Sequence, residues 1–239
     1  MSRPEFERAR SPQAKKAREA AILDAAARLA RAHGVRDVTL TDIATEVGMH
    51  KSAMLRYFET REEIFLRLSA AAWVEWSGAV RAELAALRPE PAADADAAVE
   101  IPADSTARGV AVLLADSLVA RPLFCDLLAH TPLNLERNVS FEAVRSFKLS
   151  TIAEVTAIGV ALGAVLALDG DRATSVVTTA TAMAGALWQM AAPGTRLRAF
   201  YETEPDLAHA VVDVAPRLAD ILTALLTGYG ATASGAGGG

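Results

Sequence analysis

The sequence predicts an all-α protein, with a small N-terminal helical domain followed by a larger helical domain. Apolar residues recur at helical spacing along most of the 239 residues, and no segment shows the alternating pattern of a half-buried strand. Residues that cap helices stand where several of these patterns begin. Hydrophobic residues make up 52% of the chain and charged residues 22%, which fits a globular protein and argues against disorder.

The first helices are separated by short breaks with clear capping signals. Gly34 supplies a stop for the first helix, and Gly48 permits a tight turn after the second. Thr39 is followed three residues later by Asp42, close to a capping box, and Thr60 repeats the pattern. The expected helices of this region cover about residues 15–33, 40–47 and 51–58.

The rest of the chain reads as a series of longer helices. A Pro- and Asp-rich loop is expected over 88–105, and Asp-Gly-Asp at 169–171 breaks an otherwise continuous pattern. The expected helices cover about residues 60–87, 106–120, 122–130, 138–168, 172–192 and 205–229. We therefore divide the chain into four parts: a flexible arm over 1–14, a first domain over 15–65, a second domain over 66–229, and a disordered tail over 230–239.

Charge is distributed unevenly between the two expected domains. The net charge of the chain is −5, but residues 1–70 carry 13 basic and 10 acidic side chains, a net of +3. The remainder carries 11 basic and 19 acidic side chains, a net of −8. A basic head on an acidic body is expected when only the head meets phosphate.

Compartment and membrane signals favour a cytoplasmic protein. Cys125 is the single cysteine, so no intrachain disulfide can form, and burial as a small hydrophobe is its expected role. The charged N-terminus lacks the apolar core of a secretory signal. Of two apolar stretches, 155–168 is too short to span a bilayer, and 173–195 contains enough polar residues to favour a helix buried between protein surfaces. We expect no membrane contact.

The segment 39–65 predicts a helix-turn-helix, in which the second helix enters the DNA major groove by its N-terminal end. One side of each short helix is apolar and would hold the unit together, through Leu40, Ile43, Val47, Met54 and Phe58. The opposite side of the second helix carries residues that are free to face a ligand, namely Lys51, Ser52, Leu55 and Arg56.

The same segment, TLTDIATEVGMHKSAMLRYFETREEIF, resembles the DNA-binding signature of the tetracycline-repressor (TetR) family of transcription regulators. The matching residues are Thr39, Ile43, Ala44, Gly48, Lys51, Tyr57, Phe58 and Arg61. The strong resemblance covers about residues 17–65 and is gapless. It implies a three-helix DNA-binding domain followed by a helical ligand-binding and dimerisation domain.

The resemblance also implies roles for individual residues in binding double-stranded DNA. Thr39 would offer its N–H or hydroxyl to a phosphate, Thr41, Lys51 and Ser52 would reach base edges or adjoining phosphates, and Arg56, Tyr57 and Arg61 would grip the backbone. Two positions depart from the family pattern. Leu55 replaces a tyrosine and could meet a thymine methyl, and His50 replaces the usual Ser cap, facing either DNA or solvent. A purely structural role remains open for two of these residues. Ser52 could only favour the first turn of its helix, and Arg56 could only pair with Glu59.

In the second domain the resemblance implies a homodimer interface on the last two helices. Residues 173–192 are uncharged and rich in Ala, Thr and Val, which makes close helix contact easy. Apolar residues recur at helical spacing in the last helix, at Leu207, Val211, Val214, Leu218, Ile221 and Leu225. Gly159 and Gly163 are expected to allow close helix packing.

A pocket for a small, mostly apolar effector would lie between the helices of this domain. Candidate walls are Trp73, Trp76, Phe124, Leu128, Phe147 and Trp188, with His130 and Asn134 as polar anchors. For each of these residues the alternative is ordinary core packing. The sequence does not identify the effector.

Other functional classes find little support in the sequence. The four histidines are scattered without metal-ligand spacing, and no catalytic or cofactor-binding motif occurs, so we expect neither an enzyme nor a cofactor. The predicted function is a DNA-binding regulator, a ligand-responsive repressor that binds a palindromic operator as a dimer. A helical scaffold that binds a protein partner is the alternative, which steep salt dependence and sequence-specific footprints would exclude.

Overall fold

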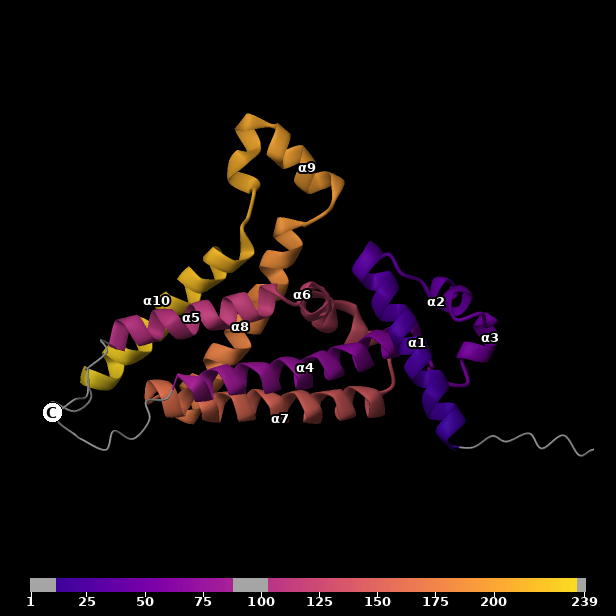
Figure 1. Ribbon diagram of the computed structural model, residues 1–239, viewed down its shortest axis with the longest axis horizontal. Helices are drawn as coiled ribbons and strands as arrows, with labels where there is room; N and C mark the ends of the chain where they lie inside the picture. Colours follow the sequence, from indigo (N-terminus) through magenta and orange to yellow (C-terminus); the bar gives the residue numbers. More distant parts are fainter. Residues whose placement is uncertain (1–11, 88–102, 236–239) are drawn as a thin grey trace, which may run out of the picture.

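A computed structural model describes residues 12–87 and 103–235 of the chain, and every regular element in these ranges is helical (Figure 1). The elements are α1 (Pro12–His33), α2 (Leu40–Glu46), α3 (Lys51–Met54), α4 (Arg61–Ala86), α5 (Ala103–Val119), α6 (Pro122–His130), the π-helix η2 (Thr131–Leu135), the 3-10 helix η3 (Glu136–Asn138), α7 (Phe141–Leu166), α8 (Gly170–Ala191), α9 (Arg196–Thr203), the 3-10 helix η4 (Pro205–Ala210) and α10 (Val214–Gly235). The predicted all-α class is confirmed.

Helices α1, α2 and α3 form a head at one end of the molecule, joined to the body through α4 (Figure 1). Ile22 of α1, Ile43 of α2 and Met54 of α3 are fully buried, and Phe58 is 2% exposed. These side chains belong to one continuous apolar core that extends into the body. The apolar faces that hold the helix-turn-helix together are therefore those that the sequence predicted.

The capping box at the start of α2 is confirmed. The Thr39 hydroxyl accepts the Asp42 N–H at 3.2 Å, and the Asp42 carboxylate accepts the Thr39 N–H at 2.8 Å. The hydrogen bond from the Thr39 hydroxyl is the main reason that the pKa of Asp42 lies below its usual value. The second box differs, because the Glu63 carboxylate accepts the N–H of Glu59 instead of the N–H of Thr60.

The second helix of the motif is shorter than predicted. α3 ends at Met54 rather than at residue 58, and the chain continues in tighter turns, in which Arg56 N–H donates to Ala53 O and Tyr57 N–H to Met54 O. His50 occupies the N-cap but makes no side-chain cap bond. A short helix without a cap has little to hold its last turn. α2 similarly ends at Glu46, one residue early.

The body consists of long helices packed side by side. α7 lies along α4, α8 packs against α6 and α7, and α10 packs against α5 and α8 (Figure 1). Gly185 brings α8 and α6 together: a Cβ added there would lie only 2.8 Å from the backbone nitrogen of Ala129. Gly159 was predicted to allow close helix packing, and the approach there is less close than at Gly185. A Cβ added to Gly159 would lie 3.6 Å from the Thr174 hydroxyl of α8.

The C-terminal third departs from the prediction of one helix over 205–229. α9 and η4 form a separate projecting arm, and α10 starts only at Val214 (Figure 1). Pro216 explains the late start, because a proline fits the first turn of a helix but breaks its interior. Leu207 and Val211 therefore lie outside α10, whose buried row consists of Val214, Leu218, Leu222 and Leu226.

Other boundaries shift by a few residues. α1 begins at Pro12, within the expected arm, and α10 reaches Gly235, within the expected tail. α7 begins later than expected, at Phe141, because Ser140 caps it by accepting the Ala143 N–H. The remaining residues of the expected arm, loop and tail, 1–11, 88–102 and 236–239, lie outside the described ranges.

One described helix, α7, is long and apolar enough to cross a membrane by length and composition alone. Residues 155–166 of the 155–168 stretch are thus part of a 26-residue helix. α7 packs against α4 and α8 through buried Val155, Ile158 and Leu162, as a helix of the protein body does. The stretch that begins at residue 173 forms most of α8, whose buried residues confirm a helix held between protein surfaces.

Candidate DNA interface and effector cavities

The helix-turn-helix presents one exposed, basic face. Lys51, Ser52, Leu55 and Arg56 are all exposed, whereas Met54 between them is fully buried. Leu55 is 53% exposed, so its side chain is free to contact an apolar group. Within the described part of the chain Arg56 forms no ion pair with Glu59. The contact that Glu59 makes there is through its backbone N–H, which donates to the Glu63 carboxylate.

The remaining residues predicted for the DNA interface divide into three kinds. Thr41 and His50 are exposed, as a contact residue requires, and Tyr57 is half-buried and packs against the core. Thr39 is exposed, but both its N–H and its hydroxyl donate to the Asp42 carboxylate, at 2.8 and 2.7 Å. The expectation that Thr39 offers these donors to a phosphate therefore needs correction, because the capping box already uses them.

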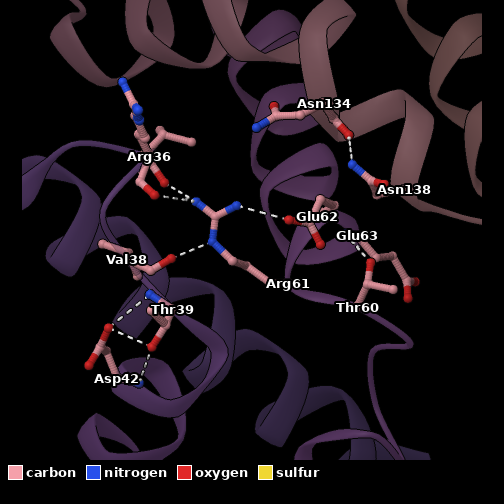
Figure 2. Close-up of polar contacts among 11 residues, drawn as sticks. Arg36, Val38, Thr39, Asp42, Thr60, Arg61, Glu62, Glu63, Asn134 and Asn138 are labelled. Atoms are coloured by element: carbon pink, nitrogen blue, oxygen red, sulfur yellow. Dashed lines mark hydrogen bonds and ion pairs between the residues drawn. The ribbon is translucent and has the colours of Figure 1, made fainter.

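Arg61 differs most from its expected role. Its guanidinium donates to the backbone carbonyls of Val35 and Val38, lies 3.4 Å from Arg36 O, and pairs with Glu62 at 3.0 Å (Figure 2). It also stacks over the Phe65 ring, and only 15% of its side chain is exposed. Arg61 thus fastens the α1–α2 connection to the start of α4, with its donors turned inward rather than toward a phosphate backbone.

In the body, the aromatic residues predicted as pocket walls form a packed cluster instead. Trp73, Trp76 and Phe124 meet edge to face or tilted, with ring centroids 5.5 to 5.7 Å apart. Trp76 is fully buried, and its indole N–H donates to Ser117 at 2.9 Å. Such geometry is typical of a core aromatic cluster, so the ordinary core-packing alternative holds for these three residues.

The other predicted wall and anchor residues are scattered. Trp188 and His130 line cavities that are described below, and Phe147 lines a separate groove of about 400 Å³ between α4 and α7. Leu128 is half-buried in the core. Asn134 is half-buried in η2, and its side-chain oxygen is buried without a hydrogen-bond partner. The structure therefore does not gather the eight residues around one pocket.

Two cavities meet at the end of α8. The larger, about 680 Å³, lies between the ends of α5 and α8, the arm and the start of α10, and is lined mainly by apolar atoms. The smaller, about 400 Å³, lies between the head and the body and is lined by His33, Gly34, Asp126, His130 and Gln189, among others. Trp188 lines both. We name them the arm cavity and the interdomain cleft.

Sequence reasoning missed the most buried carboxylate among the described residues of the body. Asp126 of α6 is 9% exposed and accepts hydrogen bonds from the Val35 N–H of the head and the Gln189 side chain of α8. Burial raises the pKa of Asp126, but the hydrogen bonds from His130, Val35 and Gln189 outweigh burial and hold the pKa below its usual value. A lone Asp inside the apolar run PLFCDLLAH was the available signal.

Cys125 is fully buried, as predicted, and donates to Leu118 O at 3.2 Å. Burial, with the adjacent Asp126 charge, raises the pKa of its thiol to about 12. We expect no alkylation of the native protein by iodoacetamide at pH 8, and rapid alkylation in denaturant, because only the thiolate reacts. The neutral thiol stabilises the fold below about pH 9, and this contribution is lost as the pH rises toward 12. Mass spectrometry of the native and denatured samples would measure the alkylation of Cys125. Fast alkylation of the native protein would contradict the raised pKa of the thiol.

An exposed basic recognition helix on a three-helix head, joined to a larger helical body, defines a helix-turn-helix DNA-binding regulator. Residues 22–68 match the family model for bacterial regulatory proteins of the tetR family, and residues 70–233 match the model for a tetracyclin repressor-like C-terminal domain. The chain belongs to the TetR family of transcriptional regulators. Among the described residues, no group of His, Cys, Asp and Glu side chains could hold a metal ion.

Solved structures similar to this chain come from several bacteria. A protein from Mesorhizobium loti, assigned to the TetR-family regulators, is 13% identical with a TM-score of 0.51, over 91% of this chain and 97% of that one. A TetR/AcrR-family regulator from Thermobifida fusca is 19% identical (TM-score 0.49, 89% and 98% covered). FadR from Bacillus subtilis, in complex with stearoyl-CoA, is 14% identical (TM-score 0.49, 85% and 97% covered). At 13% identity the likeness to the Mesorhizobium loti protein shows the fold alone. No curated protein sequence matches significantly.

Proposed function

We propose that this regulator is a cytoplasmic, homodimeric repressor that binds a partly palindromic operator and releases it when a small, mostly apolar effector binds the body. The head, residues 15–65, would read the DNA, and the body, residues 66–229, would hold the effector and the partner subunit. Family membership favours this reading over a helical scaffold, because the whole helix-turn-helix segment lies within the matched range.

The observation that carries the proposal is the exposed face of α3 and the turn after it. Lys51 and Arg56 stand free of acidic partners in the described part of the chain, above the buried Met54. Lysine and arginine side chains of this kind bind phosphates and base edges. His50, Ser52 and Leu55 would complete the contact, together with Thr41 of α2, which is also exposed.

Dimerisation through α8 and α10 is supported by the outer side of α8. Its exposed residues between positions 178 and 186 are small and uncharged, namely Thr178, Ala182 and Ala186. Such a surface permits the close, self-complementary contact of a two-fold interface. Two heads related by that symmetry would read two half-sites about one helical turn apart or a multiple of it.

The arm cavity supports the effector part of the proposal. Its volume of about 680 Å³ and mostly apolar lining suit a small apolar molecule. Arg198 and Glu202 of α9 supply polar groups at its wall. The effector must bind the head spacing that does not fit DNA more tightly than the one that does, since only differential affinity shifts an equilibrium.

The proposal is tested by genomic-fragment selection with the purified protein, followed by binding to the best fragment over a salt series. We expect a palindromic consensus and an affinity that falls steeply with salt, because phosphate contacts release counterions. Failure to enrich any sequence would overturn the operator proposal. The selected fragment then serves as the probe for an effector screen.

Dimerisation is tested by Ala182→Glu, measured by sedimentation. The two-fold axis brings both copies of the new charge into or near the interface, where an unpaired charge costs about 3 kcal/mol or more. We expect the dissociation constant of the dimer to rise by about 100-fold or more. Ala153→Glu, on the exposed side of α7, is the matched control and should leave the dimer intact. Equal effects of both variants would contradict the assignment to α8.

A further inference from the structure

The segment between α1 and α2, residues 34–38, is bonded from two sides by distant parts of the chain. The guanidinium of Arg61 in α4 donates to carbonyl oxygens of this segment. From the other side, the carboxylate of Asp126 in α6 accepts the Val35 N–H at 2.6 Å, across 91 residues of sequence. α2 begins at Leu40, directly after this segment. The bonds to residues 34–38 therefore determine where the helix-turn-helix begins relative to the body.

Asp126 connects this segment to two further groups of the body. Its Oδ2 accepts the Val35 N–H, while Oδ1 accepts the Gln189 Nε2 of α8 at 2.8 Å and lies 3.4 Å from the His130 Nε2. The Gly34 backbone turns beside the same carboxylate with a positive φ of 85°, and an added Cβ would stand 3.8 Å from Oδ2. One carboxylate thus links the head, α6 and α8.

The end of α8 lies between this carboxylate and the arm cavity. Trp188 lines the arm cavity and the interdomain cleft, and the next residue, Gln189, holds Asp126. Gly185, one turn earlier, brings α8 onto the backbone of α6, so these two helices cannot slide past each other without losing that contact. A displacement of Trp188 by a molecule in the arm cavity would reach Asp126 through the next residue.

We propose that Asp126 is a positioning residue that couples the body to the DNA-reading head: its carboxylate accepts the Gln189 side chain of α8 on one oxygen and the Val35 N–H of the head on the other. The inference rests on the proposed function for its regulatory meaning, but not for its physical content. If it holds, breaking the Asp126–Val35 bond releases the start of α2 and loosens the head while the apolar core stays folded.

The test compares Asp126→Ala with Asp126→Asn. The alanine has no side-chain oxygen, so the Val35 N–H and the Gln189 side chain both lose their acceptor. The asparagine keeps one oxygen for the Val35 N–H, and its amide N–H can donate to the side-chain oxygen of Gln189 once that amide turns over. Asp116→Ala removes an exposed carboxylate on α5 and is the matched control.

Two quantities are measured at matched thermal stability: hydrogen exchange of the peptide that contains Val35, and affinity for the selected operator. For Asp126→Ala we expect exchange about tenfold faster and operator affinity about tenfold lower, which corresponds to one charge-assisted hydrogen bond. Asp126→Asn should recover both to within about threefold of the wild type, and the control should change neither. A bond that served stability alone would lower the melting temperature without a rescue of affinity by the asparagine.

The inference is overturned if Asp126→Ala leaves Val35 exchange unchanged, or if Asp126→Asn restores neither exchange nor affinity. Exchange is measured without DNA, so this outcome is independent of the operator. If the wild-type protein selects no operator but substitution of Asp126 changes Val35 exchange as expected, the proposed repressor function fails and the coupling stands. If the wild type binds an operator and Val35 exchange does not respond, the coupling fails alone.

Discussion

Replacing Lys51 and Arg56 together by alanine is expected to lower operator affinity by about 100-fold at physiological salt and to reduce the slope of log affinity against log salt by about 2 per head. Both side chains are exposed and have no partner within the described part of the protein, so their charges are available for phosphate. Each neutralised phosphate contributes about 0.9 to that slope on duplex DNA. Fluorescence anisotropy over a salt series measures both quantities.

The same double variant should leave the fold almost unchanged, within about 0.5 kcal/mol of the wild-type free energy of unfolding, because surface substitutions rarely cost more. The matched control is Arg108→Ala/Arg145→Ala, which removes two exposed arginines from α5 and α7. If the control lost as much affinity and slope as the Lys51/Arg56 pair, general charge rather than this face would explain the binding. An unchanged slope in the test variant would place the phosphate contacts elsewhere.

Arg61→Ala is expected to destabilise the protein by about 3 kcal/mol, the upper range for hydrogen bonds to a charged group. The guanidinium bonds carbonyls of Val35 and Val38, and both residues are buried, so the alanine variant leaves these acceptors without their partner. For a chain of this size the melting temperature should fall by about 6 to 12 °C. Differential scanning calorimetry measures the change.

Arg61→Lys separates the structural role of Arg61 from a phosphate contact. A lysine keeps the positive charge but cannot hold several carbonyls in the planar pattern of a guanidinium, so it should recover less than half of the lost stability. A phosphate contact would predict the opposite: full stability in both variants, with the lysine keeping most of the operator affinity. Arg56→Ala, which we expect to change affinity and not stability, provides the comparison in the same motif.

The prediction from sequence succeeded where the determining interactions are local. The Thr39–Asp42 capping box, the stop at Gly34 and the alternation of buried Met54 with exposed Arg56 all depend on residues within about one helical turn. Length and period also separated the long helices of the body. Pro216 is a local signal of the same kind, because a proline fits the first turn of a helix but not its interior, which places the start of α10 at Val214.

The roles of the site residues were harder to predict, because the type of a residue does not tell which groups surround its side chain in the fold. An arginine about one turn after the predicted helix 51–58 fits a phosphate contact, yet the carbonyls that Arg61 bonds come from a segment 23 to 26 residues earlier. Tryptophans suit a pocket wall and a core equally well. Only packing showed that Trp76 is enclosed with Trp73 and Phe124 while Trp188 borders two cavities.

By itself, the sequence determined the helical class, the helix-turn-helix and its basic face, because helical period, caps and charge pattern are properties of neighbouring residues. The tertiary structure alone decided the partners of Arg61 and Asp126, the location of the cavities and the projection of the arm that contains α9. These features arise from segments that meet only after folding. The Asp126–Val35 hydrogen bond, which spans 91 residues, is the clearest example.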